Sequence, residues 1–208
     1  MSRDDRISYG IGVEMGKNFR NQGVPINPDY LAQGLRDSQA GVPSLLTDEE
    51  FKEAMMALRQ ELEAKQKARL DELGRKNQQD NAVFFADNGK KKGVVTLPSG
   101  LQYQVLLEGT GKKPGPEDTV TVHYTGTLLN GQEFDSSHKR GQPATFPVGG
   151  VISGWVEGLQ LMKEGGKMKL FIPPKLGYGE NGAGPMIGPH AALIFEVELL
   201  KIEPPLEK

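Results

Sequence analysis

The residues of this chain that could do chemistry gather between Val120 and Trp155. That stretch reads VTVHYTGTLLNGQEFDSSHKRGQPATFPVGGVISGW, and it ends at the only Trp of the sequence. Aromatic and branched apolar residues recur in it, with Tyr124, Phe134 and Asp135 standing beside a few other polar groups. This composition is typical of an apolar pocket that orients its ligand with a small number of polar groups.

Several other chemistries are disfavoured by the residues that are missing or badly spaced. The chain has no Cys, which excludes disulfides, thiolate nucleophiles and Cys-ligated zinc. His123, His138 and His190 lack the spacing of a metal-binding motif, so we expect no metal and no cofactor. Residues 177–182 match G-x-G-x-x-G, but the Ala-Gly-Pro that follows cannot begin the helix that a dinucleotide site requires. No G-x-S-x-G nucleophile motif is present.

Composition and charge also bear on nucleic-acid binding, membrane spans and export. The 208 residues carry a formal charge of -2, which gives no basic signature for nucleic-acid binding. No apolar run approaches the roughly 20 residues that span a bilayer. The first residues, MSRDDRISYG, are polar and do not form a signal peptide, although a signal that had been removed would leave the same picture.

Helical signals dominate the chain before about residue 89. Residues 4–22 carry an apolar stripe at Ile11, Met15 and Phe19. Their interspersed glycines either weaken this helix or let two helices approach closely. A short helix is expected over 29–38, and the capping box Thr47-Asp48-Glu49-Glu50 begins a helical run of roughly 60 Å that ends near Ala86.

Apolar residues become sparse in the long helix after Glu63. Such a helix bridges domains or packs on a partner, and a solvated linker with its weak point at Gly74 is the alternative. Val83, Phe84 and Phe85 form an apolar cluster that could dock the helix end onto the next domain. The N-terminal segments are too small to close a core alone, since about 60 residues is near the limit for independent folding. We therefore predict a homodimer formed through residues 4–62.

After Gly93 the pattern changes to glycine-punctuated strands. Alternation of apolar and polar residues predicts strands over 101–107, 119–125, 143–148, 167–172 and 192–202, with a return strand starting at Phe134. Asn130-Gly131 indicates a type I′ hairpin, and residues 154–162 form a short amphipathic helix with Trp155 facing inward. The fold class is therefore α+β, with an N-terminal all-helical part and a twisted antiparallel sheet wrapped on one short helix.

Five motifs give the second half of the chain a family resemblance. In order, they are VHYTG at 122–126, GQEFDSS at 131–137, VISGWVEG at 151–158, LGYG at 176–179 and HAALIFEVELL at 190–200. Together they resemble an FKBP-type peptidyl-prolyl cis-trans isomerase over roughly residues 97–203. SYGIGVEMGKNFRNQG and the long charged helix resemble the macrophage infectivity potentiator-like branch, in which intertwined N-terminal helices form a V-shaped homodimer.

The resemblance implies three domains and a pocket. The domains are a helical dimerisation segment (1–46), a long connecting helix (47–88) whose first half joins the dimer core, and an isomerase domain (94–208). The catalytic residues implied are Tyr124, Asp135, Ile152 and Tyr178, with Arg140 helping to hold Asp135. The residues implied to bind substrate, or the macrolide inhibitors of the family, are Phe134, Val151, Trp155, Ile187 and Phe195.

Three positions depart from the pattern of the best-known single-domain members. Ala144 stands where a pocket Phe is usual, Ala183 where a loop His occurs, and Gly188 where a loop Pro occurs. Phe146 could replace the missing Phe in part. These changes bear on the loop conformation and on the sequence preference around proline.

The expected function is peptidyl-prolyl isomerisation of unfolded or flexible polypeptides. A dimeric holdase that clamps clients between two arms is the alternative, and a purely structural adaptor is disfavoured because the pocket set is complete. The branch is mostly exported, so we expect the bacterial periplasm or outer membrane, with the cytoplasm as the alternative.

Overall fold

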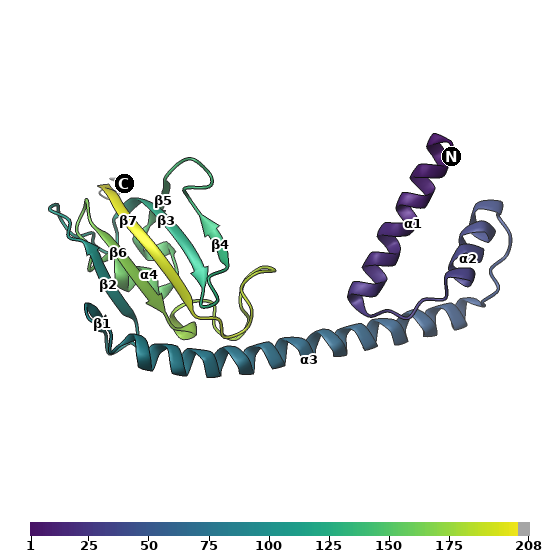
Figure 1. Cartoon of the computed structure of the whole chain (residues 1–208), viewed down its shortest axis with the longest axis horizontal. Helices are drawn as coiled ribbons and strands as arrows, with labels where there is room; N and C mark the ends of the chain where they lie inside the picture. Colours follow the sequence, from purple (N-terminus) through teal and green to yellow (C-terminus); the bar gives the residue numbers. More distant parts are fainter. Residues whose placement is uncertain (204–208) are drawn as a thin grey trace. The chain divides into compact units, whose positions relative to one another are not determined.

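The chain, analysed as a computed structural model, is described over residues 1–203 and divides into two compact units (Figure 1). The first unit is Met1–Ala68 and the second begins at Arg69. The helix α3 (Asp48–Asn88) contributes to both units. Among residues 1–203, no helix combines the length and apolar character needed to cross a membrane.

The first unit consists of α1 (Arg3–Gln22), α2 (Pro28–Ala40) and the first half of α3. Each helix starts at a side-chain cap, because the first amide groups of a helix have no partner inside it. Ser2 and Asp5 form a capping box at α1, and Asn27 accepts from the amide of Asp29 at α2. The predicted box at α3 is present, with the Glu50 amide donating to Thr47 Oγ1 at 3.2 Å.

The first unit has no core of its own. None of residues 1–68 is buried, and large apolar side chains are exposed on all three helices. Ile11 is 57% exposed, Leu35 is 63% exposed and Phe51 is 56% exposed. Helices of this length gain most of their stability from packing an apolar face, and this unit leaves its apolar faces open.

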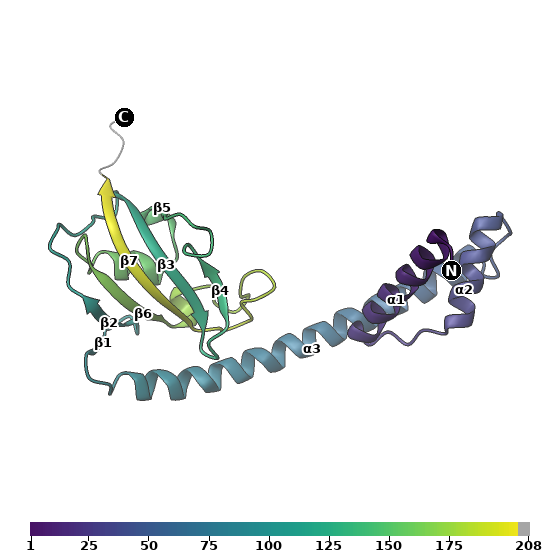
Figure 2. The ribbon, with the colours of Figure 1, turned by 45° about the horizontal axis from the view of Figure 1, so that its top comes forward.

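The second unit is built on an antiparallel sheet (Figure 2). Its strands are β1 (Val94–Thr96), β2 (Gln102–Leu107), β3 (Thr119–Leu128), β4 (Glu133–Ser136), β5 (Ala144–Pro147), β6 (Lys167–Ile172) and β7 (Leu193–Glu203). The spatial order is β1-β2-β6-β7-β3-β4, and β5 also pairs with β3. A 3₁₀ turn, η1 (Val148–Gly150), precedes the helix α4 (Ser153–Leu159). A second one, η2 (Pro174–Leu176), follows β6.

The core lies between α4 and the sheet. Along β3 the residues alternate, and Val120, Val122 and Tyr124 are buried, as a strand with one covered face requires. In α4 the side chain of Trp155 is buried, while Gly154 lets the helix approach the sheet closely. A Cβ atom on Gly154 would lie 2.5 Å from Cγ2 of Ile172. The predicted α+β class, with its sheet and single short helix, is confirmed.

The second half of α3 packs against this unit. The ring of Phe84 lies 5.8 Å from that of Phe171, and Asn88 Nδ2 donates to Gln102 Oε1 at 2.9 Å. Val83, the third member of the predicted cluster, is instead 65% exposed. At Gly74, the weak point of the alternative reading of α3, the helix runs on unbroken and the residue is buried.

Two further local predictions are corrected. The strand β1 was not predicted, since three residues are too few for a periodic pattern. The Asn130-Gly131 turn is not of type I′, which needs positive φ at both central residues. Only Gly131 has positive φ there, and its amide donates to the carbonyl oxygen of Leu128 at 3.0 Å. Gly131 thus follows the turn instead of forming its second central residue.

Candidate active site

A cavity of about 640 Å³ opens between β3, β4, α4, β7 and the loop that precedes β7. All nine residues implied by the family resemblance line it: Tyr124, Phe134, Asp135, Val151, Ile152, Trp155, Tyr178, Ile187 and Phe195. The lining also includes Phe146, Gly150, Ala183, Gly184, Pro185 and Met186. The structure therefore brings together residues that lie up to 71 positions apart, as from Tyr124 to Phe195.

Aromatic rings set edge to face form the base of the cavity. The indole of Trp155 stands perpendicular to the ring of Tyr124 at 5.2 Å and close to perpendicular to that of Phe195 at 5.1 Å. Phe134 makes the same kind of contact with Phe195, at 5.4 Å. This geometry is the one that aromatic quadrupoles favour. It produces a rigid apolar floor, in which Trp155 is only 4% exposed.

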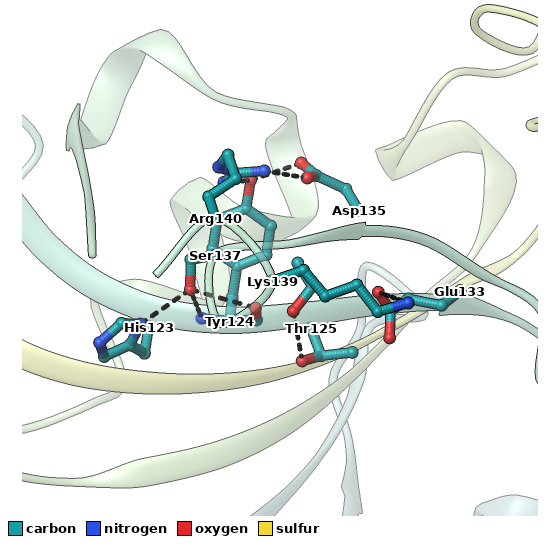
Figure 3. Close-up of polar contacts among 9 residues, drawn as sticks. His123, Tyr124, Thr125, Glu133, Asp135, Ser137, Lys139 and Arg140 are labelled. Atoms are coloured by element: carbon teal, nitrogen blue, oxygen red, sulfur yellow. Dashed lines mark hydrogen bonds and ion pairs between the residues drawn. The ribbon is translucent and has the colours of Figure 1, made fainter. Parts of the chain in front are cut away.

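One carboxylate stands at the wall of this apolar floor, and two side chains hold it (Figure 3). The Tyr124 hydroxyl donates to Asp135 Oδ2 at 2.5 Å, and the Arg140 guanidinium pairs with Asp135 Oδ1. Arg140 also donates to the Tyr124 hydroxyl at 2.9 Å. The three groups form a closed triangle, which leaves Asp135 little freedom to rotate.

The triangle sets the protonation states of its members. Burial acts to raise the pKa of Asp135, but the hydrogen bonds from Tyr124 and Arg140 outweigh it and hold this pKa below its ordinary value. Burial, followed by the bond to Asp135, raises the pKa of the Tyr124 hydroxyl. At neutral pH the carboxylate is therefore ionised and the phenol is a proton-bearing donor. Neither group has a pKa suited to proton transfer near pH 7.

A second set of polar contacts fixes the segment that carries the triangle. Ser137 is fully buried, and its Oγ accepts from the Tyr124 amide at 2.8 Å and lies 2.9 Å from Nδ1 of His123. The rings of His123 and His138 stack at 4.5 Å. These contacts anchor the turn between Asp135 and Arg140 to β3 (Figure 3). Ser137 is thus a structural residue of the turn.

Two further polar groups belong to residues that line the cavity, the N–H of Ile152 and the hydroxyl of Tyr178. Ile152 is the N-cap of α4, and its carbonyl accepts from the Trp155 amide at 2.8 Å. Its own N–H makes no hydrogen bond to any of residues 1–203. Tyr178, which follows η2, lines the cavity and remains 40% exposed. Both groups are available to a bound ligand.

Comparison with known proteins agrees with this geometry. Residues 110–200 match the family model described as FKBP-type peptidyl-prolyl cis-trans isomerase, and residues 4–105 match the domain amino terminal to it. The chain is 46% identical to outer membrane protein MIP of Legionella longbeachae, over 96% of this chain and 85% of that protein. The chain belongs to the FKBP-type peptidyl-prolyl cis-trans isomerases.

Two further relatives extend the match over the whole chain. The peptidyl-prolyl cis-trans isomerase Mip of Coxiella burnetii is 41% identical, over 97% of this chain and 88% of that protein. The crystal structure of FkpA from Escherichia coli superposes with a TM-score of 0.76 at 38% identity, and 98% of each chain is covered. The matches to Mip and FkpA therefore cover both the helical region and the sheet region of this FKBP-type isomerase.

The three departures from the common pattern have visible surroundings. Ala144 pairs with Val122 in the sheet, and Phe146, two residues along β5, lines the cavity and lies 5.8 Å from the Trp155 ring. Ala183 lines the cavity and forms an isolated bridge with Ile187. Gly188 lies outside the cavity, against α3.

Sequence reasoning missed Gly150, Gly184, Pro185 and Met186 as lining residues. Three of these lie in one irregular loop, where no periodicity distinguishes inward from outward side chains. The Gly-Pro pair at 184–185 predicts a turn but does not reveal which surface the turn covers.

Proposed function

We propose that the enzyme catalyses isomerisation in the aromatic cavity by holding the X–Pro amide in its twisted form, away from water. The observation that carries this proposal is the rigid aromatic floor with one ionised, immobilised carboxylate at its wall. Rotation about the amide needs no bond to the substrate to be made or broken. The barrier of about 18–20 kcal/mol comes from amide resonance, which places negative charge on the oxygen.

The cavity suits a reaction that loses amide resonance. Water stabilises the charged oxygen of the planar amide, and an apolar enclosure removes that stabilisation. The twisted amide is less polar, so the enclosure favours it over both planar forms, and only such differential binding accelerates the reaction. A millionfold acceleration corresponds to about 8 kcal/mol of differential binding.

We assign roles to the cavity residues on this basis. Trp155 forms the floor beneath the proline ring, and Phe134, Val151, Ile187 and Phe195 enclose it. The Ile152 N–H and the Tyr178 hydroxyl bind substrate carbonyls. These same surfaces would take the macrolide inhibitors of the family.

Asp135 has an electrostatic role in this proposal. It does not donate a proton, because its pKa lies below the ordinary value for Asp. Its fixed negative charge faces the reacting amide, where resonance charge changes during rotation. Tyr124 and Arg140 keep that charge in place.

The test compares two carboxylates of β4. Asp135→Leu removes the charge at the cavity, and we expect kcat/KM on a proline peptide to fall about tenfold or more while the circular dichroism spectrum is unchanged. Glu133→Leu is the matched control, because Glu133 pairs with Lys139 at 2.9 Å and does not line the cavity. If Asp135→Leu keeps the activity of the Glu133→Leu variant, the role assigned to Asp135 is wrong.

We further propose that the first unit forms a homodimer. Support comes from its complete lack of buried residues beside well-capped helices and from the match to the family's amino-terminal domain. A second copy would cover the stripe of Ile11 and Met15, which are 57% and 39% exposed. The α1 glycines at 10, 12 and 16 have open space around a Cβ position, so two backbones could meet there closely.

Sedimentation velocity of full-length variants tests the dimer. Ile11→Glu combined with Met15→Glu places charges in the apolar stripe and is expected to give a monomer. Asn21→Glu on the same helix lies outside the stripe and should sediment as the wild type does. A monomeric wild type, or a double variant that stays dimeric, would contradict the proposal.

Apolar side chains of the first unit outside the α1 stripe, such as that of Leu35, which is 63% exposed, also favour a second function, the holding of unfolded clients. For location we propose the cell envelope, periplasm or outer membrane, because the Legionella longbeachae relative is named an outer membrane protein. Fractionation of cells beside a periplasmic marker tests this, and recovery with the cytosol would support the alternative.

A further inference from the structure

The loop that forms one wall of the cavity rests on α3. Residues 183–187 line the cavity and are joined as a small hairpin, with the Ala183 amide donating to Ile187 O at 2.8 Å and the Ile187 amide to Ala183 O at 3.2 Å. The next residues, 188–190, leave the cavity and run along the second half of α3. The position of Ile187 therefore depends on what holds its neighbour Gly188.

Two asparagines of α3 hold this segment by its backbone. Asn77 Nδ2 donates to the carbonyl oxygen of Pro189 at 2.8 Å, and Asn81 Nδ2 donates to that of His190 at 2.8 Å. The two asparagines are four residues apart, so they project from the same face of the helix. They bind the carbonyls of two consecutive residues, which fixes both the position of the segment along α3 and its direction.

Close packing accompanies these bonds. A Cβ atom on Gly188 would lie 2.6 Å from Cδ2 of Leu73, and one on Gly74 would lie 3.3 Å from the His190 ring. His190 has φ of 54°, the left-handed conformation that non-glycine residues seldom adopt. Its amide donates to Gly179 O at 2.8 Å, which closes the base of the loop. The segment is held in a conformation that it would not prefer alone.

Asn81 is a polar residue in a buried position. It is only 8% exposed, and its Oδ1 makes no hydrogen bond to any of residues 1–203. The contact that this side chain makes is its hydrogen bond to the His190 carbonyl.

We propose that Asn77 and Asn81 are positioning residues of the isomerase site. Through Pro189 and His190 they set the place of the cavity wall formed by residues 183–187, and α3 is thereby a structural part of the active site. The proposal rests on the cavity being the site of catalysis. It also accounts for Gly188, where a larger residue would meet Leu73.

The test uses full-length Asn77→Ala, Asn81→Ala and their combination. Gln79→Ala is the matched control, since it removes an exposed amide side chain from the same helix. Asp135→Leu is the reference for loss of the carboxylate that lines the cavity. Each variant is assayed for kcat and KM on a proline peptide, for peptide affinity by the fluorescence of Trp155, and for thermal unfolding.

We expect the double Asn variant to lose roughly three- to tenfold in kcat/KM, mainly through a raised KM, because the wall encloses the peptide in every state. Peptide affinity measured by Trp155 fluorescence should weaken by a similar factor. Hydrogen exchange of residues 182–191 should accelerate, while exchange in β3 stays as in the wild type. The Gln79→Ala variant should match the wild type throughout.

Three results would overturn the proposal. The first is an unchanged kcat/KM in the double variant while Asp135→Leu is impaired. The second is a loss of activity no larger than the unfolded fraction at the assay temperature. The third is a fall in kcat at unchanged KM, which would mean that the asparagines do not act through the enclosing wall. An unimpaired Asp135→Leu variant would instead refute the role of that carboxylate, which is a separate failure.

Discussion

Tyr124→Phe tests the electrostatic triangle by removing a single oxygen atom. The phenylalanine ring keeps the edge-to-face contact with Trp155, so the floor of the cavity is preserved. The change removes the 2.5 Å hydrogen bond to Asp135 and the acceptor for Arg140. Arg140, whose side chain is 43% exposed, then remains the only side chain among residues 1–203 that holds Asp135, beside the backbone of Ser136.

The size of the effect follows from the exposure of the carboxylate. A hydrogen bond to a charged group contributes about 1.5–3 kcal/mol. The Asp135 side chain is 41% exposed, so water replaces part of the lost bond, and about 1–1.5 kcal/mol remains. The pKa of Asp135 should therefore rise in the variant, because a hydrogen bond that favours the ionised form is lost.

The sign of the pH dependence is fixed by the direction of the Asp135 shift. Burial opposes ionisation, but the bonds from Tyr124 and Arg140 prevail and the folded-state pKa is depressed. The stability this provides is present above the unfolded pKa of about 4 and is lost as pH falls through the folded pKa. In Tyr124→Phe that loss, and the acidic fall of activity, should begin at a higher pH than in the wild type.

The measurement is the cis–trans exchange rate of a proline peptide by NMR from pH 3 to 7, which needs no protease. Circular dichroism at each pH restricts the comparison to folded enzyme. At pH 7, where Asp135 is ionised in both proteins, we expect kcat/KM to fall less than in Asp135→Leu, because the charge is kept and only its positioning is loosened. An acidic limb at the same pH in both proteins would refute the inference that Tyr124 controls the charge of Asp135.

Three other predictions concern packing and the separation of functions. Gly126→Ala would place a Cβ 2.7 Å from two aromatic rings of the cavity, so kcat/KM should fall more than the folded fraction does in a parallel urea titration. Gly154→Ala would press α4 against Ile172 and should lower the free energy of unfolding by about 1–3 kcal/mol, whereas Gly115→Ala, with only ordinary contacts, should not. If the holding of clients is separate from isomerisation, Asp135→Leu should lose isomerase activity and still suppress aggregation of an unfolded client. A parallel loss of isomerase activity and of aggregation suppression would show that the two functions are not separate.

The parts of the fold that sequence could predict are those with a regular period or a side-chain signature. Alternation along β3 placed its buried face correctly, and the Thr47–Glu50 capping box marked the start of α3 within one residue. The cavity residues were found because the family motifs bring widely separated positions into one pattern. Composition alone would have assigned Trp155 and Phe195 to an ordinary core, and both are indeed buried.

The parts that sequence could not predict depend on what a residue touches. Gly74 looks like a helix weakness, yet the close approach of His190 requires the missing side chain. Asn77 and Asn81 look like two more polar residues on a solvated helix, because their partners lie more than a hundred residues away. Met186 gives no periodic signal, since it sits in a loop whose path is set by that same helix.

The position of β7 in the sheet determines when the cavity is completed during synthesis of the chain. This strand lies between β6 and β3 in the sheet, and it carries Phe195, which meets Trp155 at the cavity floor. It follows every other strand and helix of the unit in the chain. A growing polypeptide therefore has an open sheet, and no complete cavity, until Phe195 has left the ribosome. A growing chain therefore cannot act as an isomerase on its own earlier segments, because its cavity is completed last.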